Sequence, residues 1–435
     1  MAWAPPRNVN QGQNMPQTSD SEYTHLFKNA QISAIATQEI PKILVIMANF
    51  SDYALVSSKA VVDSMFNAAD WTTDGAKGSV RQYFYDQSSG QYNPQFDVVG
   101  PITLSQTYSY YGANSGSKKD ANVGYMITEA CALVDDSVNF ANYDVNGDGK
   151  VDLVFVLYAG FGENDPPTTD LVPVSSKLIW PHYWNIESAG YGTNNRTFDG
   201  VDVFAYECSC ELDGYYSTAA MKVEAGIGIA CHEFGHALGL PDWYSTNGYS
   251  HKTLGRWSIM DYGCYNDDLH SPAAYTLYER QLLGWQQPDT IIEDGTNYYL
   301  IEQRTRTGWD RGLPGAGWML TYIRPNLNSN NNAQNMAYDI IEADGQAPTY
   351  SGGQNIGWFG KAGDLFNTRN QALYNLGCDT TLVPDTTTIP DTIPTAIVAT
   401  QFPAQRKQTQ TIMQNGQIYI ITDWGKYTIV GIKQY

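Results

Sequence analysis

The segment at residues 231–242 constrains the fold of this chain more than any other. It reads Cys-His-Glu-Phe-Gly-His-Ala-Leu-Gly-Leu-Pro-Asp. His232 and His236 stand one helical turn apart, so both imidazoles leave the same face of a helix. Gly239 can adopt the left-handed conformation that ends a helix, and Pro241 prevents the helix from resuming. We therefore expect a helix that presents two imidazoles and then turns back on itself.

These side chains are suited to holding a metal ion. The imidazole nitrogens of His232 and His236 can each approach one Zn²⁺ to about 2.0–2.1 Å, and the turn brings Asp242 back as a third ligand. Glu233 can lean over the metal without ligating it and act as a general base. Three protein ligands leave a fourth position for water, so the pattern predicts a catalytic rather than a structural zinc site.

A second motif follows at residues 256–263, which read Arg-Trp-Ser-Ile-Met-Asp-Tyr-Gly. It resembles the Met-turn of metzincin metallopeptidases. The resemblance implies that Met260 forms an apolar floor beneath the zinc and that Tyr262 binds the metal or stabilises the oxyanion. In many metzincins the third zinc ligand is a histidine, which leaves His251 as the alternative to Asp242.

Several other stretches resemble peptidases of the immune inhibitor A family: residues 40–52, 144–162, 179–182, 339–345 and 363–366. The resemblance covers about residues 38–370 and implies a secreted bacterial zinc endopeptidase. It also implies an α+β chain, in which a metzincin-type catalytic domain with a twisted mixed sheet and a zinc-site helix precedes an all-β, sandwich-like domain.

The apolar pattern divides the chain into three parts. Residues 1–37 are rich in Gln, Asn, Pro and Ser and are expected to be a flexible leader or the remnant of a propeptide. In residues 38–285 strands alternate with helices, which indicates a domain built on a sheet. This domain is expected to be the metzincin-like catalytic domain. Residues 286–435 hold short β-rich runs and predict a C-terminal β domain.

The periodicity also places the individual elements. Strands are expected at residues 42–48, 95–99, 151–158, 177–184, 201–208, 298–303, 317–323, 338–343, 417–422 and 427–432. Helices are expected at residues 60–69, 79–87, 122–134, 219–238 and 272–283, the last with Pro272 in its first turn. Residues 379–400, rich in Thr and Pro, are expected to form a long surface loop.

The acidic run at residues 144–152 resembles the start of an EF-hand calcium loop. Oxygens at its odd-numbered positions can wrap a hard cation, and Gly149 permits the sharp turn at the sixth position. Phe155 stands where a bidentate carboxylate is expected, so calcium would need a ligand from elsewhere. The alternative is an Asx-rich turn before a strand. The candidate calcium ligands are Asp144, Asn146, Asp148, Lys150 through its carbonyl, and Asp152.

Other polar groups leave their roles open. Glu342, Asp344 and Asp364 could form another cation site or a solvated acidic loop. His182 could lie beside the cleft or be a structural histidine. The six cysteines have no tight metal-binding spacing, and their sequence cannot pair them in disulfides.

Composition excludes several classes of function. The formal charge is −20, which argues against nucleic acid and against docking on anionic lipid. No run of about 18 apolar residues exists to span a membrane. Charged residues are only 16% of the chain, which favours a secreted or cell-surface protein, and no signal peptide is visible at its start. We expect a monomer that acts on protein or peptide substrates.

Three functional hypotheses follow. The first is a zinc endopeptidase with Glu233 as general base. The second is an inactive surface-binding protein that keeps the peptidase fold and uses its Tyr- and Trp-rich β domain for contact. The third is a gluzincin-type peptidase with Glu279 as the third ligand, which would leave Gly239, Asp242 and Met260 unexplained.

Overall fold

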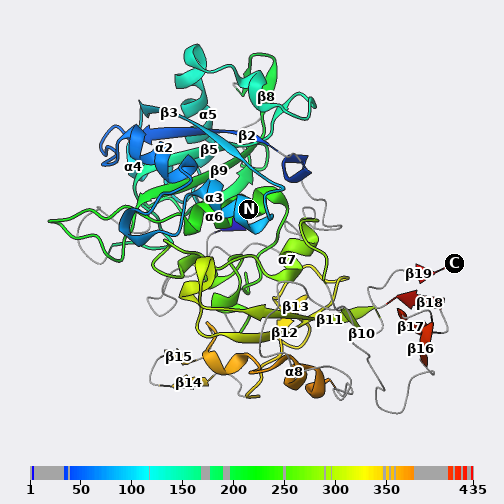
Figure 1. Cartoon of the computed structure of the whole chain (residues 1–435). Helices are drawn as coiled ribbons and strands as arrows, with labels where there is room; N and C mark the ends of the chain where they lie inside the picture. The colour runs from blue at the N-terminus through cyan, green and yellow to red at the C-terminus, as the bar shows by residue number, and fades with distance from the viewer. Residues whose placement is uncertain are drawn as a thin grey trace.

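The computed structural model describes most of the chain. The described residues are 2–3, 34–37, 40–116, 118–167, 177–189, 196–247, 251–288, 291–294, 296–345, 349–351, 354–356, 359–376 and four short strands between 410 and 434. None of the described helices is long and apolar enough to cross a membrane. Figure 1 shows a sheet with helices on both sides, and below it a second, smaller sheet.

The first part is built on a six-stranded mixed sheet in the order β1-β6-β9-β5-β2-β3. Strands β3, β2, β5 and β9 are parallel to one another, whereas β6 is antiparallel to β9 and β1 is antiparallel to β6. The strands are β1 (Ala2–Trp3), β2 (Lys42–Asn49), β3 (Gln95–Thr103), β5 (Val154–Phe161), β6 (His182–Asn185) and β9 (Ala205–Leu212). The expected mixed α+β architecture is therefore present.

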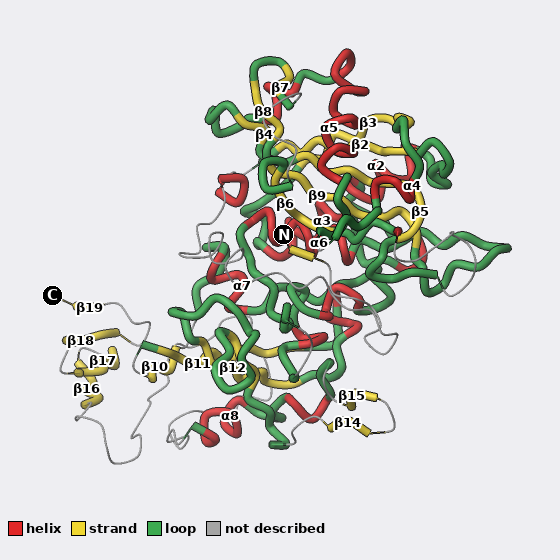
Figure 2. Tube along the Cα trace, turned by 180° about the vertical axis from the view of Figure 1, so that it is seen from behind, coloured by secondary structure: helices red, strands yellow, loops and turns green. Residues whose placement is uncertain are grey.

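Helices cover both faces of this sheet, which explains why the central strands β2 and β5 are almost continuously apolar. In β2, Val45 points to the core shared with α2, α3 and α6, whereas Ile46 points to the core shared with α4 and α5. Figures 1 and 2 show α3 and α6 on one side of the sheet and α5 on the other. The helices are α2 (Lys59–Asn67), α3 (Val80–Gln87), α4 (Tyr108–Tyr111), α5 (Val123–Val134) and α6 (Gly228–Leu238).

The helix that carries the two histidines is shorter than the sequence pattern predicts. The expected helix at 219–238 begins only at Gly228. Upstream of it the chain is extended, and the Ala225 N–H donates to the Glu211 carbonyl at 2.8 Å, next to the end of β9. A Cβ at Gly228 would lie 1.9 Å from the Cys264 carbonyl oxygen, so this close start requires glycine. Pairing with the sheet edge overrides helix propensity here.

Three other predicted elements also differ. The helix expected at 272–283 is α7 (Leu277–Leu282), because Thr276 and Glu279 form a capping box that starts it after Pro272. The strand expected at 201–208 is divided into β8 (Val201–Val203) and β9. β8 belongs to a small sheet with β4 (Lys150–Val151) and β7 (Thr197–Phe198), and only residues from His182 onwards form the strand expected at 177–184.

The second part contains a four-stranded antiparallel sheet of β10 (Ile291–Asp294), β11 (Asn297–Arg304), β12 (Gly317–Ile323) and β13 (Tyr338–Ile340). One face places Ile301 and Leu320 against Ala372 and Leu373 of α8 (Arg369–Asn375). The opposite face adds its apolar side chains to the core that contains α6. A helix thus covers the outer face in the described residues, and the expected β-sandwich is not confirmed.

The remaining described elements are short. Two further antiparallel sheets consist of β14 (Thr349–Ser351) with β15 (Gln354–Ile356), and of β16 (Gln410–Gln414), β17 (Gln417–Thr422), β18 (Gly425–Thr428) and β19 (Lys433–Gln434). The 3₁₀ helices are η2 (Ala34–Thr37), η3 (Thr73–Gly75), η4 (Asp135–Ser137), η5 (Phe140–Tyr143), η7 (Gly255–Trp257), η8 (Tyr262–Tyr265), η9 (Gly308–Gly312) and η10 (Ala362–Asp364). The loop expected at 379–400 lies outside the described residues.

Parts of the expected leader contact the folded core. Ala2 and Trp3 pair with Tyr183 and His182 of β6, and Ile35 and Ala36 are buried in the core that contains α6. The division at residues 37 and 285 stays a prediction.

An aromatic cluster under the sheet allows the packing to be tested. The buried Phe66 ring on α2 lies 5.2 Å from the Phe96 ring and 5.0 Å from the Phe155 ring, between centroids. We expect Phe66→Ala to lower the free energy of unfolding by about 3–5 kcal/mol, because it removes buried area and leaves a cavity. Val61→Ala, on the exposed side of the same helix, should change it by less than about 1 kcal/mol in the same urea titration. Equal losses would contradict this packing.

Candidate metal centre

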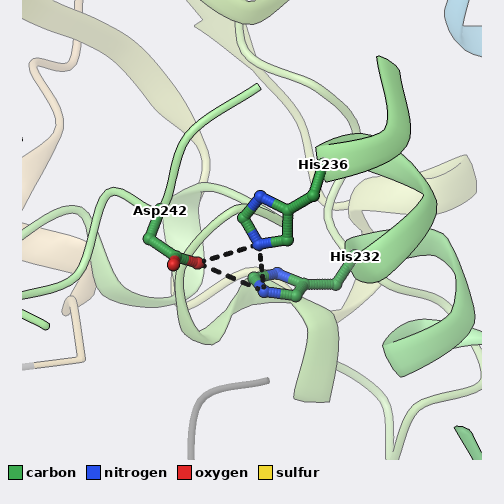
Figure 3. A group of neighbouring side chains, drawn as sticks. All are labelled: His232, His236 and Asp242. Carbon is green, nitrogen blue, oxygen red and sulfur yellow. Dashed lines mark hydrogen bonds and ion pairs between the residues drawn. The ribbon is translucent and has the colours of Figure 1, made fainter. Parts of the chain in front are cut away.

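Three side chains converge at the end of α6. The Nε2 atoms of His232 and His236 are 3.3 Å apart, and Asp242 Oδ1 lies 3.4 Å from the first and 3.0 Å from the second. All three side chains are buried. Figure 3 shows the two rings and the carboxylate pointing to one common position. Among the described residues, this is the one group of three or more His, Cys, Asp or Glu side chains close enough to hold a metal ion.

Backbone carbonyls orient both imidazoles. Nδ1 of His232 lies 2.7 Å from the Ile259 carbonyl oxygen, and Nδ1 of His236 lies 2.8 Å from the Leu240 carbonyl oxygen. Since a carbonyl oxygen can only accept, each neutral ring carries its proton on Nδ1 and presents a lone pair at Nε2. This second layer of hydrogen bonds fixes the tautomer that a metal ligand needs.

The return of the chain to the histidines depends on one left-handed residue. Gly239 has φ 106°, and its N–H donates to the His236 carbonyl at 2.9 Å. The Leu240 N–H donates to the Gly235 carbonyl at 3.0 Å, which closes the turn. The chain reverses as expected from the glycine and places Asp242 beside the rings.

The donor set fits a divalent cation. Two imidazole lone pairs and one carboxylate oxygen face one another without a hydrogen to join them, which is unfavourable unless a positive charge lies among them. Burial alone would raise the pKa of Asp242, but the charge and the hydrogen bonds of His236 and His232, when these rings are protonated, hold that pKa well below the usual value, and a cation at the same position would act in the same direction. The carboxylate is therefore ionised and available as a ligand.

The residues of the predicted Met-turn lie directly against this helix. Met260 is fully buried, and a Cβ at Gly235 would lie 2.5 Å from its Sδ. The Met260 carbonyl accepts from the Trp243 N–H at 2.8 Å, so the turn also holds the residue after Asp242. Tyr262, at the start of η8, is buried, and its ring centroid lies 4.3 Å from that of Phe359.

Glu233 is fully buried beside the ligands. Burial raises its pKa well above the usual value, with further contributions from Glu207 and Asp242, and the backbone amide of Tyr183 partly opposes the rise. The sequence analysis missed Glu207, whose side chain alternates onto the α6 side of β9 and is fully buried. An acidic residue inside a strand whose residues are all buried was the feature that could have revealed it.

The alternative third ligands point elsewhere. His251 Nε2 lies 2.7 Å from the Asn330 carbonyl oxygen. Glu279 accepts from the Ser258 hydroxyl and from the Thr276 N–H as part of a helix cap. Neither joins His232 and His236, so the geometry favours Asp242 over both.

The acidic run at residues 144–152 forms a turn stabilised by its own side chains. The Asp144 carboxylate accepts from the N–H groups of Asp148 and Gly149, and the Asp148 carboxylate accepts from the Lys150 N–H. Asp152 accepts from the Val145 N–H in the same way. Gly149 has φ 83°, the positive value that the sixth position of a calcium loop requires.

The chain itself neutralises the acidic residues expected near a second cation. The Lys252 ammonium pairs with Glu342 and lies 3.3 Å from Asp364 Oδ1. Lys361 Nζ lies 2.7 Å from Asp344 Oδ2. Asp364 is fully buried whereas Asp344 is exposed, so the three acidic residues do not form one solvated loop.

His182 is a structural histidine. It is fully buried, with Nδ1 2.7 Å from the Trp180 carbonyl oxygen and Nε2 2.9 Å from the Tyr206 hydroxyl. The described cysteines are all buried and free: Cys131, Cys208, Cys210, Cys231 and Cys264. Cys378 lies outside the described residues.

Asp261 holds the turn together, and sequence reasoning gave it no role. Its Oδ2 accepts from the Thr253 hydroxyl at 2.7 Å and the Gly255 N–H at 2.8 Å, and its Oδ1 accepts from the Tyr262 N–H at 2.8 Å. Burial raises the pKa of Asp261 to about 7. An acidic residue within a buried apolar motif was the available signal.

A helix with an HExxH pattern, an adjacent buried glutamate and a third ligand beyond a left-handed turn defines the class of metallopeptidase sites. The chain belongs to the immune inhibitor A peptidase family M6, whose catalytic-domain model matches residues 29–286.

Two curated relatives align with about half of the chain or slightly less. The Pre-pro-metalloprotease PrtV of Vibrio cholerae serotype O1 is 26% identical over 246 residues, which cover 51% of this chain and 25% of that protein. Immune inhibitor A of Bacillus thuringiensis subsp. alesti is 27% identical over 217 residues, which cover 44% of this chain and 29% of that protein. The match thus spans between about a quarter and a third of the length of each relative.

The raised pKa of Asp261 leads to a pH-dependent stability. Between the unfolded value of 3.8 and the folded value of about 7, the folded chain binds the extra proton. Its stability should therefore fall as pH rises through this window, by up to about 4 kcal/mol relative to Asp261→Asn. Urea unfolding of both proteins at pH 4 to 7 measures the difference. Asp135→Asn, at an exposed aspartate, should parallel the wild type, and a parallel Asp261→Asn curve would contradict the assignment.

Proposed function

We propose that the chain is a zinc-dependent endopeptidase that hydrolyses peptide bonds in protein substrates. The observation that carries the proposal is the convergence of His232, His236 and Asp242, with Glu233 next to the first ligand. The separations of their donor atoms, 3.0 to 3.4 Å, are short enough for all three groups to contact one metal ion, and two imidazoles with one carboxylate form a donor set that zinc accepts.

Zinc, when bound, would lower the pKa of a water molecule and polarise the scissile carbonyl. His232, His236 and Asp242 would hold it, and three protein ligands leave room for water and substrate. Met260 would form the apolar floor of the site, a role supported by its contact with α6 at Gly235.

Glu233 would act on the protons of the reaction. Its carboxylate would take the proton of the attacking water and then donate it to the leaving amine. A pKa raised above the usual value suits a carboxylate that both accepts and releases a proton during the reaction. We assign Tyr262 to stabilising the oxyanion with its hydroxyl group.

We place the chain among the metzincins. The mixed sheet with one antiparallel strand, the α6 helix and the turn at Met260 support this assignment. We also propose that it works outside the cytoplasm, as a monomer, on protein or peptide substrates. The low share of charged residues, 16%, supports an extracytoplasmic setting.

Replacing Glu233 separates metal binding from catalysis. We expect Glu233→Gln to retain one zinc per chain and to lower the rate of casein cleavage by about 10²–10⁴-fold, because the general base is lost. Zinc content by elemental analysis and cleavage by zymography measure the two effects. A chelator should abolish wild-type cleavage, and added zinc should restore it.

Glu187→Gln, at a half-exposed glutamate side chain on the same part of the fold, is the matched control and should cleave as the wild type does. Undiminished cleavage by Glu233→Gln would overturn the assignment. Wild-type cleavage that persists with the metal removed would overturn the role of zinc.

We propose in addition that the loop at residues 144–152 binds calcium. The bonds from loop amides occupy only part of the accepting capacity of Asp144 and Asp148, and each carboxylate keeps further lone pairs for a cation. Asn146, the Lys150 carbonyl and Asp152 would complete the set, together with a ligand from outside the loop. Several acidic side chains in one exposed turn also repel one another without a cation.

Calcium should raise the melting temperature of the wild type, since a ligand at 100 times its Kd stabilises the folded state by about 2.7 kcal/mol. The variant Asp144→Asn/Asp148→Asn should lose this response. Asp136→Asn, an exposed aspartate outside the loop, should keep it. Equal calcium responses in all three proteins would exclude the loop as the site.

A further inference from the structure

The turn at residues 258–263 fixes two of the three converging ligands. The Ile259 carbonyl accepts from Nδ1 of His232, and the Met260 carbonyl accepts from the Trp243 N–H, next to Asp242. A displacement of the turn would therefore move one ligand directly and a second through its neighbour.

The residue that leads into this turn, Trp257, is held by the C-terminal part of the chain. It is fully buried. Its carbonyl accepts from Arg304 Nη1 at 3.0 Å, and its indole N–H donates to Asp364 Oδ2 at 3.0 Å. A Cβ at Gly360 would lie 2.6 Å from its Nε1, so the backbone there packs directly on the indole. The preceding Arg256 N–H donates to the Phe359 carbonyl at 2.8 Å.

Arg304 is itself rigidly placed. Asp310 accepts two bonds from its guanidinium, at 2.8 and 2.7 Å, and the Ala274 carbonyl accepts a third at 3.2 Å. Burial alone would lower the pKa of Arg304, but the carboxylates of Asp310 and Glu302 hold it above its usual value. A planar guanidinium with four such contacts leaves the Trp257 carbonyl little freedom.

Asp364 is fixed in the same manner. Its Oδ2 also accepts from the Lys361 N–H at 2.9 Å, and its Oδ1 lies 3.3 Å from the Lys252 ammonium. Asp364 is fully buried and Lys252 nearly so. The carboxylate thus joins the segment before the turn to the segment after the second sheet.

We infer that Arg304 and Asp364 are positioning residues of the metal centre, acting through Trp257 on the turn that orients His232 and Asp242. Both lie beyond residues 29–286, the region that the family's catalytic-domain model matches. The inference rests on the proposed function for the identity of the metal, but it concerns the geometry of the ligands. The C-terminal part of the chain then helps to position the ligands of the metal centre.

The experiment measures metal binding in the full chain. Trp257→Phe keeps a ring but removes the N–H that Asp364 accepts, and Asp364→Asn removes the charge that faces Lys252. We expect each variant to bind zinc about tenfold more weakly in chelator competition, as is typical for residues that support metal ligands. With cobalt as the probe, their visible absorption should shift, because this spectrum reports the arrangement of the ligands.

Two comparisons make the result specific. Asp344→Asn breaks the neighbouring pair with Lys361, does not touch Trp257, and should leave zinc affinity and the cobalt spectrum unchanged. The double variant Trp257→Phe/Asp364→Asn should bind zinc no more weakly than the weaker single variant, because both act through one contact. Arg304→Lys keeps the charge but loses the planar fork, and should also weaken binding.

Wild-type affinity and an unchanged cobalt spectrum in Trp257→Phe and Asp364→Asn would overturn the inference. Losses equal to those in Asp344→Asn would do the same, since they would reflect general destabilisation. The readout is metal binding and not cleavage, so a chain that binds zinc but cleaves nothing would reject the proposed function and leave this test valid.

Discussion

Mutual repulsion among three electron-rich atoms is the constraint on which the rest of the structure depends. Two imidazole nitrogens and a carboxylate oxygen lie within 3.0 to 3.4 Å of one another. A free chain would separate them. The fold holds them together with a helix, a left-handed glycine and two backbone carbonyls, each of which is fixed by packing elsewhere. The placement of these three side chains therefore depends on α6, on the turn at Met260 and on the residues that hold that turn.

The region around α6 is unusually acidic for a protein interior. Glu207, Glu233, Asp242 and Asp261 are all buried, and burial raises the pKa of three of them. Asp242 is the exception, because His236 and His232, when protonated, lower its pKa. Environment thus divides four similar side chains into one with a lowered pKa and three with a raised pKa. In the proposed function, this difference in pKa distinguishes Asp242, the metal ligand, from Glu233, the group that exchanges protons.

The sequence was most informative where local chemistry decides the structure. The spacing of His232 and His236, the left-handed Gly239 and the continuous apolar run of β2 each act within a few residues, and each appears as expected. The start of α6 could not be predicted, because the residues before it pair with the end of β9. The apolar periodicity of a segment does not show which other segment it pairs with. Helix propensity does not include such a partner.

The support of the centre was equally hidden for a physical reason. Arg304 and Asp364 come from segments that are distant in sequence from Trp257 and meet it only in the tertiary structure. No spacing rule links a guanidinium to a carbonyl oxygen at such a sequence separation. The β-sandwich expectation had a related weakness, since alternating apolar residues show that a strand face is covered but not whether a sheet or, as with α8, a helix covers it.

The burial of the five described cysteines affects which side chains of the folded chain can bind zinc. In an unfolded chain, thiols compete with imidazoles for zinc, and metal bound there opposes folding. Closure of the core withdraws all five sulfurs from solvent, and burial raises the pKa of each thiol, which disfavours the thiolate that a metal requires. Completion of folding therefore withdraws these five sulfur ligands from the competition and favours nitrogen and oxygen donors for a captured ion.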